Sequence, residues 1–288
     1  MVSIVAGIGL KLPRYCSPRG LRCRFFGESQ QQLLLVKTWL AMDDTTDYEF
    51  SVFDEWSLYD EIIERNYMKH AEISAAVSRD LSSMNLNPVN KGSANKINEI
   101  WDLGCGCGAM AAKILGGWSV SKYTGVDLSQ AGLARIEANL SASVSSVCTE
   151  SSEIVDFLDQ QVSVCPSVIL ASFSLHHFPM EEIQRVLELI VKHMDSQSRF
   201  VWIDTVRQTH ETREEFNRRF LLDISTQWTS LLPEQMLEVE EHITQYDFPL
   251  DQIERERLLS GAGLKGLTVS YQDPFYTAEI FTRVSAGE

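Results

Sequence analysis

The spacing of apolar positions changes along the chain and divides it into segments. Residues 50–84 carry apolar side chains at helical spacing, which predicts a helical segment. Residues 85–96 are rich in Asn, Pro, Gly and Ser, as loops are, and we place a boundary between two parts of the chain there. From residue 97 to residue 203, short apolar strands alternate with amphipathic helices. Such alternation is typical of a parallel sheet covered by helices on both faces.

The alternation stops at residues 205–249, a long charged stretch in which we expect helices. It resumes with a helix predicted over 250–261, followed by strands over 267–271 and 276–282. The connection between these two strands is short, which favours an antiparallel hairpin over another helical crossover. The pattern therefore predicts an α/β domain that ends in an antiparallel strand pair.

Charge is distributed unevenly along the 288 residues, whose formal net charge is -15. Residues 1–41 form a basic head of net charge +5, and the rest of the chain carries -20. An Arg-rich, acid-poor start is the composition of an organelle transit peptide. A disordered arm, or translated upstream sequence with the true start at Met42, accounts for it equally well. We expect a cytoplasmic protein, or one in a plastid or mitochondrion if the head is a transit peptide.

The composition argues against several classes of partner. The acidic body has no basic run of the kind that binds nucleic acid. The longest apolar runs fall short of the ~20 residues that span a bilayer. Six cysteines are sparse for this length and favour a reducing compartment. We therefore expect no nucleic-acid or membrane partner.

A glycine loop at residues 104–108 follows a predicted strand and opens a helix. Glycines let the chain turn tightly and let a ligand approach the backbone. Asp127 ends the next strand, nineteen residues after Gly108, where a carboxylate can accept hydrogen bonds from both hydroxyls of a ribose. This arrangement is the general nucleoside site of doubly wound sheets. Gly104, Gly106 and Ala109 also fit the glycine pattern of dinucleotide sites, so the loop by itself leaves a nicotinamide cofactor open.

Asp102 distinguishes S-adenosylmethionine from a nicotinamide dinucleotide as the expected cofactor. Its carboxylate, at the strand end, would repel a pyrophosphate but attract the ammonium and sulfonium of S-adenosylmethionine. The segment DLGCGCG at residues 102–108 resembles motif I of class I S-adenosylmethionine-dependent methyltransferases. Residues 123–129, 152–158 and 168–178 look like motifs II, III and IV, so the resemblance covers about residues 97–283. Motif IV lacks the D/N-P-P-Y form of DNA or protein amide methylases and is of the small-molecule type.

The resemblance implies the fold, the cofactor and the residues that bind it. The fold would be a doubly wound, Rossmann-like seven-stranded sheet with an antiparallel last strand, plus helical N-terminal and inserted lid segments at 50–84 and 205–249. The expected cofactor-binding residues are Asp102, Gly104, Gly106 and Gly108 for the methionine end, Asp127 and Leu128 for the ribose, Glu153 and Ile154 for the adenine, and Ser172. Glu153 replaces the usual Asp, and the register could slip to Glu150.

Histidines and cysteines lie near the expected site. His176 and His177 follow the fourth strand, where either could act as a catalytic base, since the pKa of histidine lies near neutrality. A structural role for the pair is the alternative, because methyl transfer to an aligned acceptor does not require a base. Cys105 and Cys107 are not accompanied by ligands at zinc-site spacing, so we predict no metal site.

The two lid segments would shape the acceptor pocket. From them we expect Trp56, Tyr59, Tyr67, Arg207 and Arg213 to line it, although aromatic residues at helical spacing are often simply core. The predicted function is methyl transfer from S-adenosylmethionine to a small-molecule acceptor by in-line displacement. The alternatives are a nicotinamide-dependent oxidoreductase that uses the same loop, and a non-catalytic methyltransferase-like binding module.

Overall fold

The computed structural model describes residues 52–84, 86, 95–140, 142–162 and 164–284. The basic head at 1–41 lies outside the described residues, so its role stays a prediction. Among the described residues, no helix combines the length and the apolar character needed to span a membrane.

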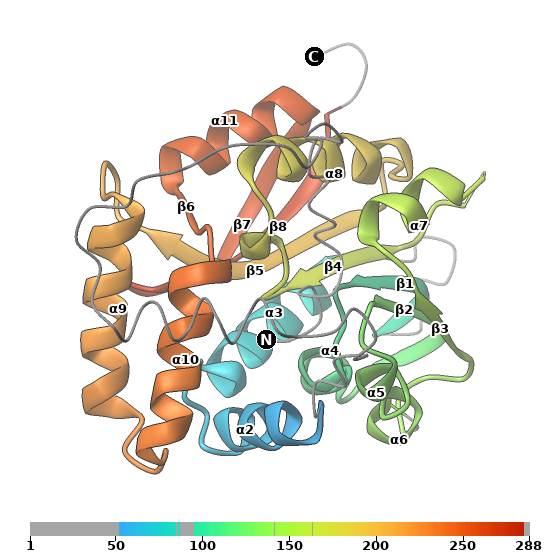
Figure 1. Cartoon of the computed structure of the whole chain (residues 1–288). Helices are drawn as coiled ribbons and strands as arrows, with labels where there is room; N and C mark the ends of the chain where they lie inside the picture. The colour runs from blue at the N-terminus through green and yellow to red at the C-terminus, as the bar shows by residue number, and fades with distance from the viewer. Residues whose placement is uncertain (1–51, 85, 87–94, 141, 163, 285–288) are drawn as a thin grey trace, which may run out of the picture.

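One mixed sheet forms the centre of the molecule (Figure 1). Its strands are β1 (Lys96–Leu103), β2 (Ser119–Asp127), β3 (Val147–Ser151), β4 (Val168–Ser172), β5 (Arg199–Arg207), β6 (Leu250–Asp251), β7 (Leu264–Gln272) and β8 (Tyr276–Arg283). Seven of them follow the order β3-β2-β1-β4-β5-β8-β7, and β6 adds a short parallel pairing to β5. Strands β1 to β5 pair in parallel, whereas β8 is antiparallel to both β5 and β7. This confirms the predicted seven-stranded Rossmann-like sheet with its antiparallel end.

Helices cover both faces of the sheet (Figure 1). They are α2 (Val52–Glu64), α3 (His70–Ser83), α4 (Ala109–Leu115), α5 (Gln130–Leu133), α6 (Ile136–Leu140), α7 (Ile154–Gln160), the 3-10 helix η2 (Leu175–His177), α8 (Met180–Lys192), α9 (Arg213–Gln227), α10 (Pro233–Tyr246) and α11 (Gln252–Ala262). Helices α7, α8 and α11 lie together on one face, and α3, α4 and α6 lie on the other. Two buried apolar clusters, one on each face, form the core.

The local sequence explains where several helices begin. The Ser129 hydroxyl accepts a hydrogen bond from the Gly132 amide at 3.1 Å and so caps the N-terminus of α5. The short helix α6 follows directly after α5. In the 205–249 insertion, Thr212 and Glu215 form a capping box at the start of α9. Strand β3 begins at Val147, and Val144 before it forms an isolated bridge to Val120.

A buried ion pair fixes α11 against the antiparallel end of the sheet. The Arg255 Nη2 donates to Glu279 on β8 at 2.7 Å, and the guanidinium lies 3.5 Å from the centre of the Trp202 ring on β5. Arg255 is 1% exposed, so removal of either charge would leave the other unpaired in the core. The sheet is therefore anchored at the side away from the glycine loop, and the site forms where β1 and β4 separate.

Candidate functional site

The strand order brings two loops together at the site. Strand β1 lies between β2 and β4, so the chain leaves β1 and β4 on opposite sides of the sheet. Ligands of such sheets bind at this switch point, outside the carboxyl ends of the strands. Here the glycine loop after β1 faces Ser172, Phe173 and Ser174 after β4.

Hydrogen bonds from the backbone hold the glycine loop to the end of β2. The amides of Gly104 and Cys105 both donate to the Val126 carbonyl, at 2.8 and 3.1 Å. The Asp127 carboxylate accepts from the amides of Gly106 at 2.7 Å and Ser129 at 2.8 Å. Asp127 thus ties the loop after β1 to the start of α5, and its own position at the pocket edge is fixed by the same two bonds.

Gly104 has no room for a side chain. Its φ is +69°, a left-handed conformation, and a Cβ on it would lie 2.4 Å from the Cβ of Ser174. The Ser174 hydroxyl in turn donates to the Leu103 carbonyl at 2.9 Å. The close approach therefore joins the loop after β1 to the segment after β4.

Asp102 lies beneath this loop and is 1% exposed. The Tyr123 hydroxyl donates to its Oδ2 at 2.6 Å, and its Oδ1 receives no hydrogen bond from the described residues. Burial raises the pKa of Asp102 to about 7, the Tyr123 hydrogen bond opposes this shift, and the nearby Asp127 charge adds to it. A positive ligand above the loop would favour the ionised form of this carboxyl.

Two pockets meet at Gly104. The smaller, of about 200 Å³, is lined by Gly104, Asp127, Leu128, Ser152, Glu153, Ile154 and Phe178. The larger, of about 430 Å³, is lined by Tyr59, Gly104, Cys105, Gly106, Cys107, Ala109, Met110, Ser172, Phe173, Ser174 and His177. A ligand that spans both would pass over Gly104, with one end beside Asp127 and the other beside His177.

Most of the predicted cofactor-binding residues line these pockets. Asp127, Leu128, Glu153 and Ile154 share the smaller one, and Gly104 belongs to both. Glu153 lines the smaller pocket, whereas Glu150, the alternative residue in the sequence, is exposed on β3. Gly106 and Ser172 line the larger pocket. Asp102 and Gly108 line neither; Gly108, with φ +74°, is the N-cap residue of α4 and lies near Ile136.

The predicted acceptor-pocket residues are brought together only in part. Tyr59 lines the larger pocket, and burial raises its pKa. Trp56 lies in α2, but its side chain is outside the described part of the structure. The Tyr67 ring stacks on Trp228 with centroids 5.3 Å apart, and its hydroxyl is 2.7 Å from the Ser230 Oγ. Tyr67 therefore joins the N-terminal helices to the insertion and is not among the described residues that line either pocket.

The two predicted arginines also serve the packing of the insertion. Arg207 donates to the Pro249 carbonyl at 2.6 Å and pairs with Glu254 at 2.5 Å. Arg213 donates to the Asp247 and Thr244 carbonyls at 2.6 and 2.8 Å. Neither is among the described residues that line the larger or the smaller pocket. Their guanidinium groups are occupied by the backbone at the end of α10 and just after it, and that of Arg207 also by Glu254.

His176 and His177 lie at the rim of the larger pocket but have different surroundings. His177 lines the pocket, and burial together with the neighbouring His176 lowers its pKa. His176 lies behind it at 2% exposure. Burial by itself would lower the pKa of His176, but the carboxylates of Asp204 and Asp247 outweigh burial and raise it. Of the two, only His177 is placed to touch a molecule in the pocket.

Sequence reasoning missed the two carboxylates of this histidine pair. Asp204 accepts from the Trp202 indole at 2.9 Å and from the His176 backbone amide at 3.1 Å, and it contacts the His176 Nδ1. An acidic residue inside the apolar strand VWIDTV was the available signal for Asp204. Asp247 lies between α10 and β6 with no motif around it, and its carboxylate contacts both His176 and His177.

The geometry defines a nucleoside-binding site of the Rossmann-like class, with a carboxylate at the end of β2 and a glycine cradle beside it. Residues 100–197 match the family of methyltransferase domains. The match covers about a third of the chain, and the fold of this domain is that of the class I, S-adenosylmethionine-dependent methyltransferases. No curated protein sequence matches the chain significantly.

Solved structures share the fold at low sequence identity. An O-methyltransferase family 2 protein from Planctomyces limnophilus, in complex with apigenin, is 13% identical; the match covers 89% of this chain and 67% of that one, with a TM-score of 0.54. A methyltransferase from Clostridium acetobutylicum is 8% identical over 81% of this chain and 100% of that one, with a TM-score of 0.55. The magnesium protoporphyrin IX methyltransferase of Synechocystis, with bound S-adenosylhomocysteine, is 13% identical over 87% and 99%, with a TM-score of 0.52.

The close approach at Gly104 predicts that Gly104→Ala destabilises the protein by more than the backbone cost of a left-handed alanine, which is about 1 kcal/mol. Gly263→Ala is the matched control, because Gly263 has φ +81° and nothing within 4 Å of the added Cβ. Urea unfolding should show the larger loss for Gly104→Ala, and Ser174→Gly in the same chain should recover part of it. Equal losses at the two glycines would contradict the packing explanation.

The pKa of Asp102 predicts a pH-dependent stability. The folded protein keeps this carboxyl protonated up to about pH 7, whereas the unfolded chain ionises it from about pH 4. Relative to Asp102→Asn, the wild type should therefore lose about 1 kcal/mol per pH unit across this window and nothing further above about pH 8. Denaturant titrations of both proteins over this range measure the difference. A difference that is independent of pH would show that Asp102 is ionised throughout.

Proposed function

We propose that the protein transfers the methyl group of S-adenosylmethionine to a small-molecule acceptor held in the larger pocket. The observation that carries this proposal is the pair of pockets that share Gly104. The smaller one offers groups suited to a nucleoside, and the larger one offers an aromatic and polar space beside it. When bound, the cofactor would supply a methyl group activated by its sulfonium. The acceptor atom would bond to the methyl carbon as the carbon–sulfur bond breaks, S-adenosylhomocysteine would leave with the bonding electron pair, and the acceptor would release a proton.

In this proposal the chain's residues divide the work of binding the cofactor. The Asp127 carboxylate receives the ribose hydroxyls, and Leu128 lies beside it. Glu153 and Ile154 flank the adenine in the smaller pocket. The glycine loop lets the methionine end approach the backbone, and the Asp102 charge acts on the ammonium from beneath the loop rather than by lining the pocket.

The walls of the larger pocket support a small acceptor. Phe173 and Met110 offer apolar surface, Tyr59 adds a wall from α2, and His177 adds a polar group at the rim. A net charge of -15 disfavours a polyanionic acceptor. The Planctomyces fold relative contains apigenin, a small aromatic molecule, which is in keeping with an acceptor of this size. His177 would contact the acceptor, and alignment within the pocket would supply most of the rate.

The assignment of the smaller pocket predicts that Asp127→Ala weakens the binding of S-adenosylhomocysteine at least about tenfold, because a charge-assisted hydrogen bond is worth about 1.5–3 kcal/mol. Calorimetry with the purified chain measures it. Asp156→Ala is the matched control, since Asp156 is exposed on α7 and lines neither pocket. NADH should leave the melting temperature unchanged while S-adenosylhomocysteine raises it. Unchanged affinity in Asp127→Ala would refute the assigned role.

The assignment of the larger pocket predicts where the methyl group goes. After incubation of the protein with methyl-labelled S-adenosylmethionine and a cell extract, the label should appear in the low-mass fraction. Tyr59→Ala should lower this transfer severalfold while S-adenosylhomocysteine still binds, and Tyr67→Phe, a change outside the pocket lining, should not. Label found in protein or nucleic acid would overturn the small-molecule proposal, and no label in any fraction would favour a non-catalytic module.

A further inference from the structure

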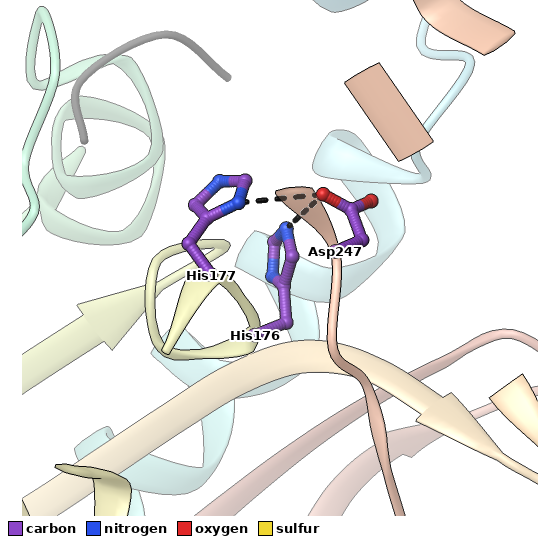
Figure 2. Close-up of side chains that lie close together, drawn as sticks. All are labelled: His176, His177 and Asp247. Atoms are coloured by element: carbon purple, nitrogen blue, oxygen red, sulfur yellow. Dashed lines mark ion pairs between the residues drawn. The ribbon is translucent and has the colours of Figure 1, made fainter. Parts of the chain in front are cut away.

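A buried cluster of histidines and carboxylates lies behind the larger pocket. It gathers His176 and His177 from η2, Asp247 from the segment after α10, His242 from α10 and Asp204 from β5. Figure 2 shows the rings of His176 and His177 side by side, each with one nitrogen directed at the same oxygen of Asp247. These groups come from parts of the chain that the folded structure brings together, and methyl transfer does not by itself require them.

The polar atoms at the centre of the cluster lack hydrogen bonds. Asp247 is 1% exposed, yet neither of its carboxylate oxygens receives a hydrogen bond from the described residues. The His176 Nε2 is equally buried and equally without a hydrogen bond from the described residues. Because a buried carboxylate without donors is costly, this arrangement requires a compensating positive charge.

The spacing of these atoms matches the edge of a tetrahedron around a metal ion. The Asp247 Oδ1 is 3.5 Å from the His176 Nε2 and 3.3 Å from the His177 Nδ1. The three ligand atoms all lie within 4.8 Å of one another. Bonds of about 2.0–2.1 Å in tetrahedral geometry place ligands about 3.3 Å apart. The separations from Asp247 to the two histidines therefore already match this edge, and the two histidine nitrogens lie within 4.8 Å of each other.

The surroundings of His176 prepare its Nε2 to act as a ligand. Asp204 contacts the Nδ1 of His176 and also accepts from its backbone amide at 3.1 Å. A proton held between Nδ1 and this carboxylate leaves the lone pair on Nε2, on the side of Asp247. A carboxylate that orients the far nitrogen of a histidine is the usual second partner of a metal-binding imidazole.

Two further contacts show how a proton, instead of a metal ion, would neutralise part of the Asp247 charge. The His177 Nδ1 is also 3.3 Å from the Tyr246 carbonyl, and the His242 Nε2 is 3.4 Å from the Asp247 Oδ1. A proton on the Nε2 of His176, or on one of these two histidines, would offset part of the Asp247 charge without a metal. His242 alternatively supplies a fourth ligand, or leaves that position open, as in sites with three protein ligands.

We propose that His176, His177 and Asp247 bind one divalent first-row transition-metal ion of the zinc class behind the larger pocket. Imidazole and carboxylate ligands suit such ions, and two neutral imidazoles with Asp204 and Asp247 balance its charge. Because His177 also lines the pocket, the ion fixes the ring that faces a bound molecule. The site is distinct from the cofactor pocket and does not depend on the proposed acceptor.

Binding of Co²⁺ and Zn²⁺ to the untagged full chain tests this proposal. After dialysis against a chelator, the protein should take up one Co²⁺ per chain, with the visible absorption of a tetrahedral complex, and Zn²⁺ should displace it. Zn²⁺ should also raise the melting temperature. Native mass spectrometry of the same samples counts the bound ions. Failure to bind either ion in the folded, chelator-treated protein would overturn the proposal and favour a protonated histidine.

Variants locate the ion. Asp247→Asn and His177→Gln should each abolish stoichiometric Co²⁺ uptake, and Asp204→Asn should weaken it about 10–100-fold. His210→Gln, which changes an exposed histidine outside the cluster, is the matched control. Circular dichroism checks that each variant is folded. If Asp247→Asn does not fold, His177→Gln alone tests the site. Uptake that survives both substitutions would place the ion elsewhere. Calorimetry with S-adenosylhomocysteine on the metal-free chain tests the cofactor site separately.

Discussion

The packing of Gly104 against Ser174 is the contact on which the rest of the site depends. It occurs where β1 and β4 lie side by side and their chains turn to opposite faces of the sheet. A side chain at Gly104 would push the segment after β4 away from the glycine loop. That segment continues directly into η2, which carries His176 and His177. One backbone contact therefore sets both the floor of the cofactor site and the placement of the histidines beside it.

Two carboxylates below and beside the loop set the charge of the site. Asp127 has its oxygens occupied by the amides of Gly106 and Ser129, whereas Asp102 has Tyr123 as its hydrogen-bond donor. Burial and the Asp127 charge then raise the pKa of Asp102 toward neutrality. A carboxyl with such a pKa becomes ionised when a positively charged ligand binds above it, and the negative pyrophosphate of a dinucleotide offers no such gain. The electrostatics thus agree with the cofactor of the methyltransferase family and disfavour the nicotinamide alternative.

Most of the predicted cofactor-binding residues lie close together in the structure because they follow strand ends. The ends of parallel strands converge at one edge of a sheet, so Asp127, Glu153 and Ser172 meet there once the strands are recognised. Differences in strand bounds, such as the start of β7 at Leu264 rather than at residue 267, did not alter this convergence. The same reasoning placed His177 near the site, because it follows the end of β4.

No comparable rule predicts which residues of the 205–249 insertion face a pocket. A helical stretch rich in arginine and aromatic residues looks the same whether its side chains face a ligand or a neighbouring helix. In the structure, Arg207 and Arg213 bind carbonyls around α10, and Tyr67 stacks on Trp228. Asp247 reaches its histidines across about 70 positions of sequence, a separation that no motif encodes. Of the residues that line the larger pocket, Tyr59 comes from α2, outside the motifs, and His177 contacts Asp247 after α10. Changes in α2 or α10 can therefore alter the shape of this pocket without disturbing the glycine loop.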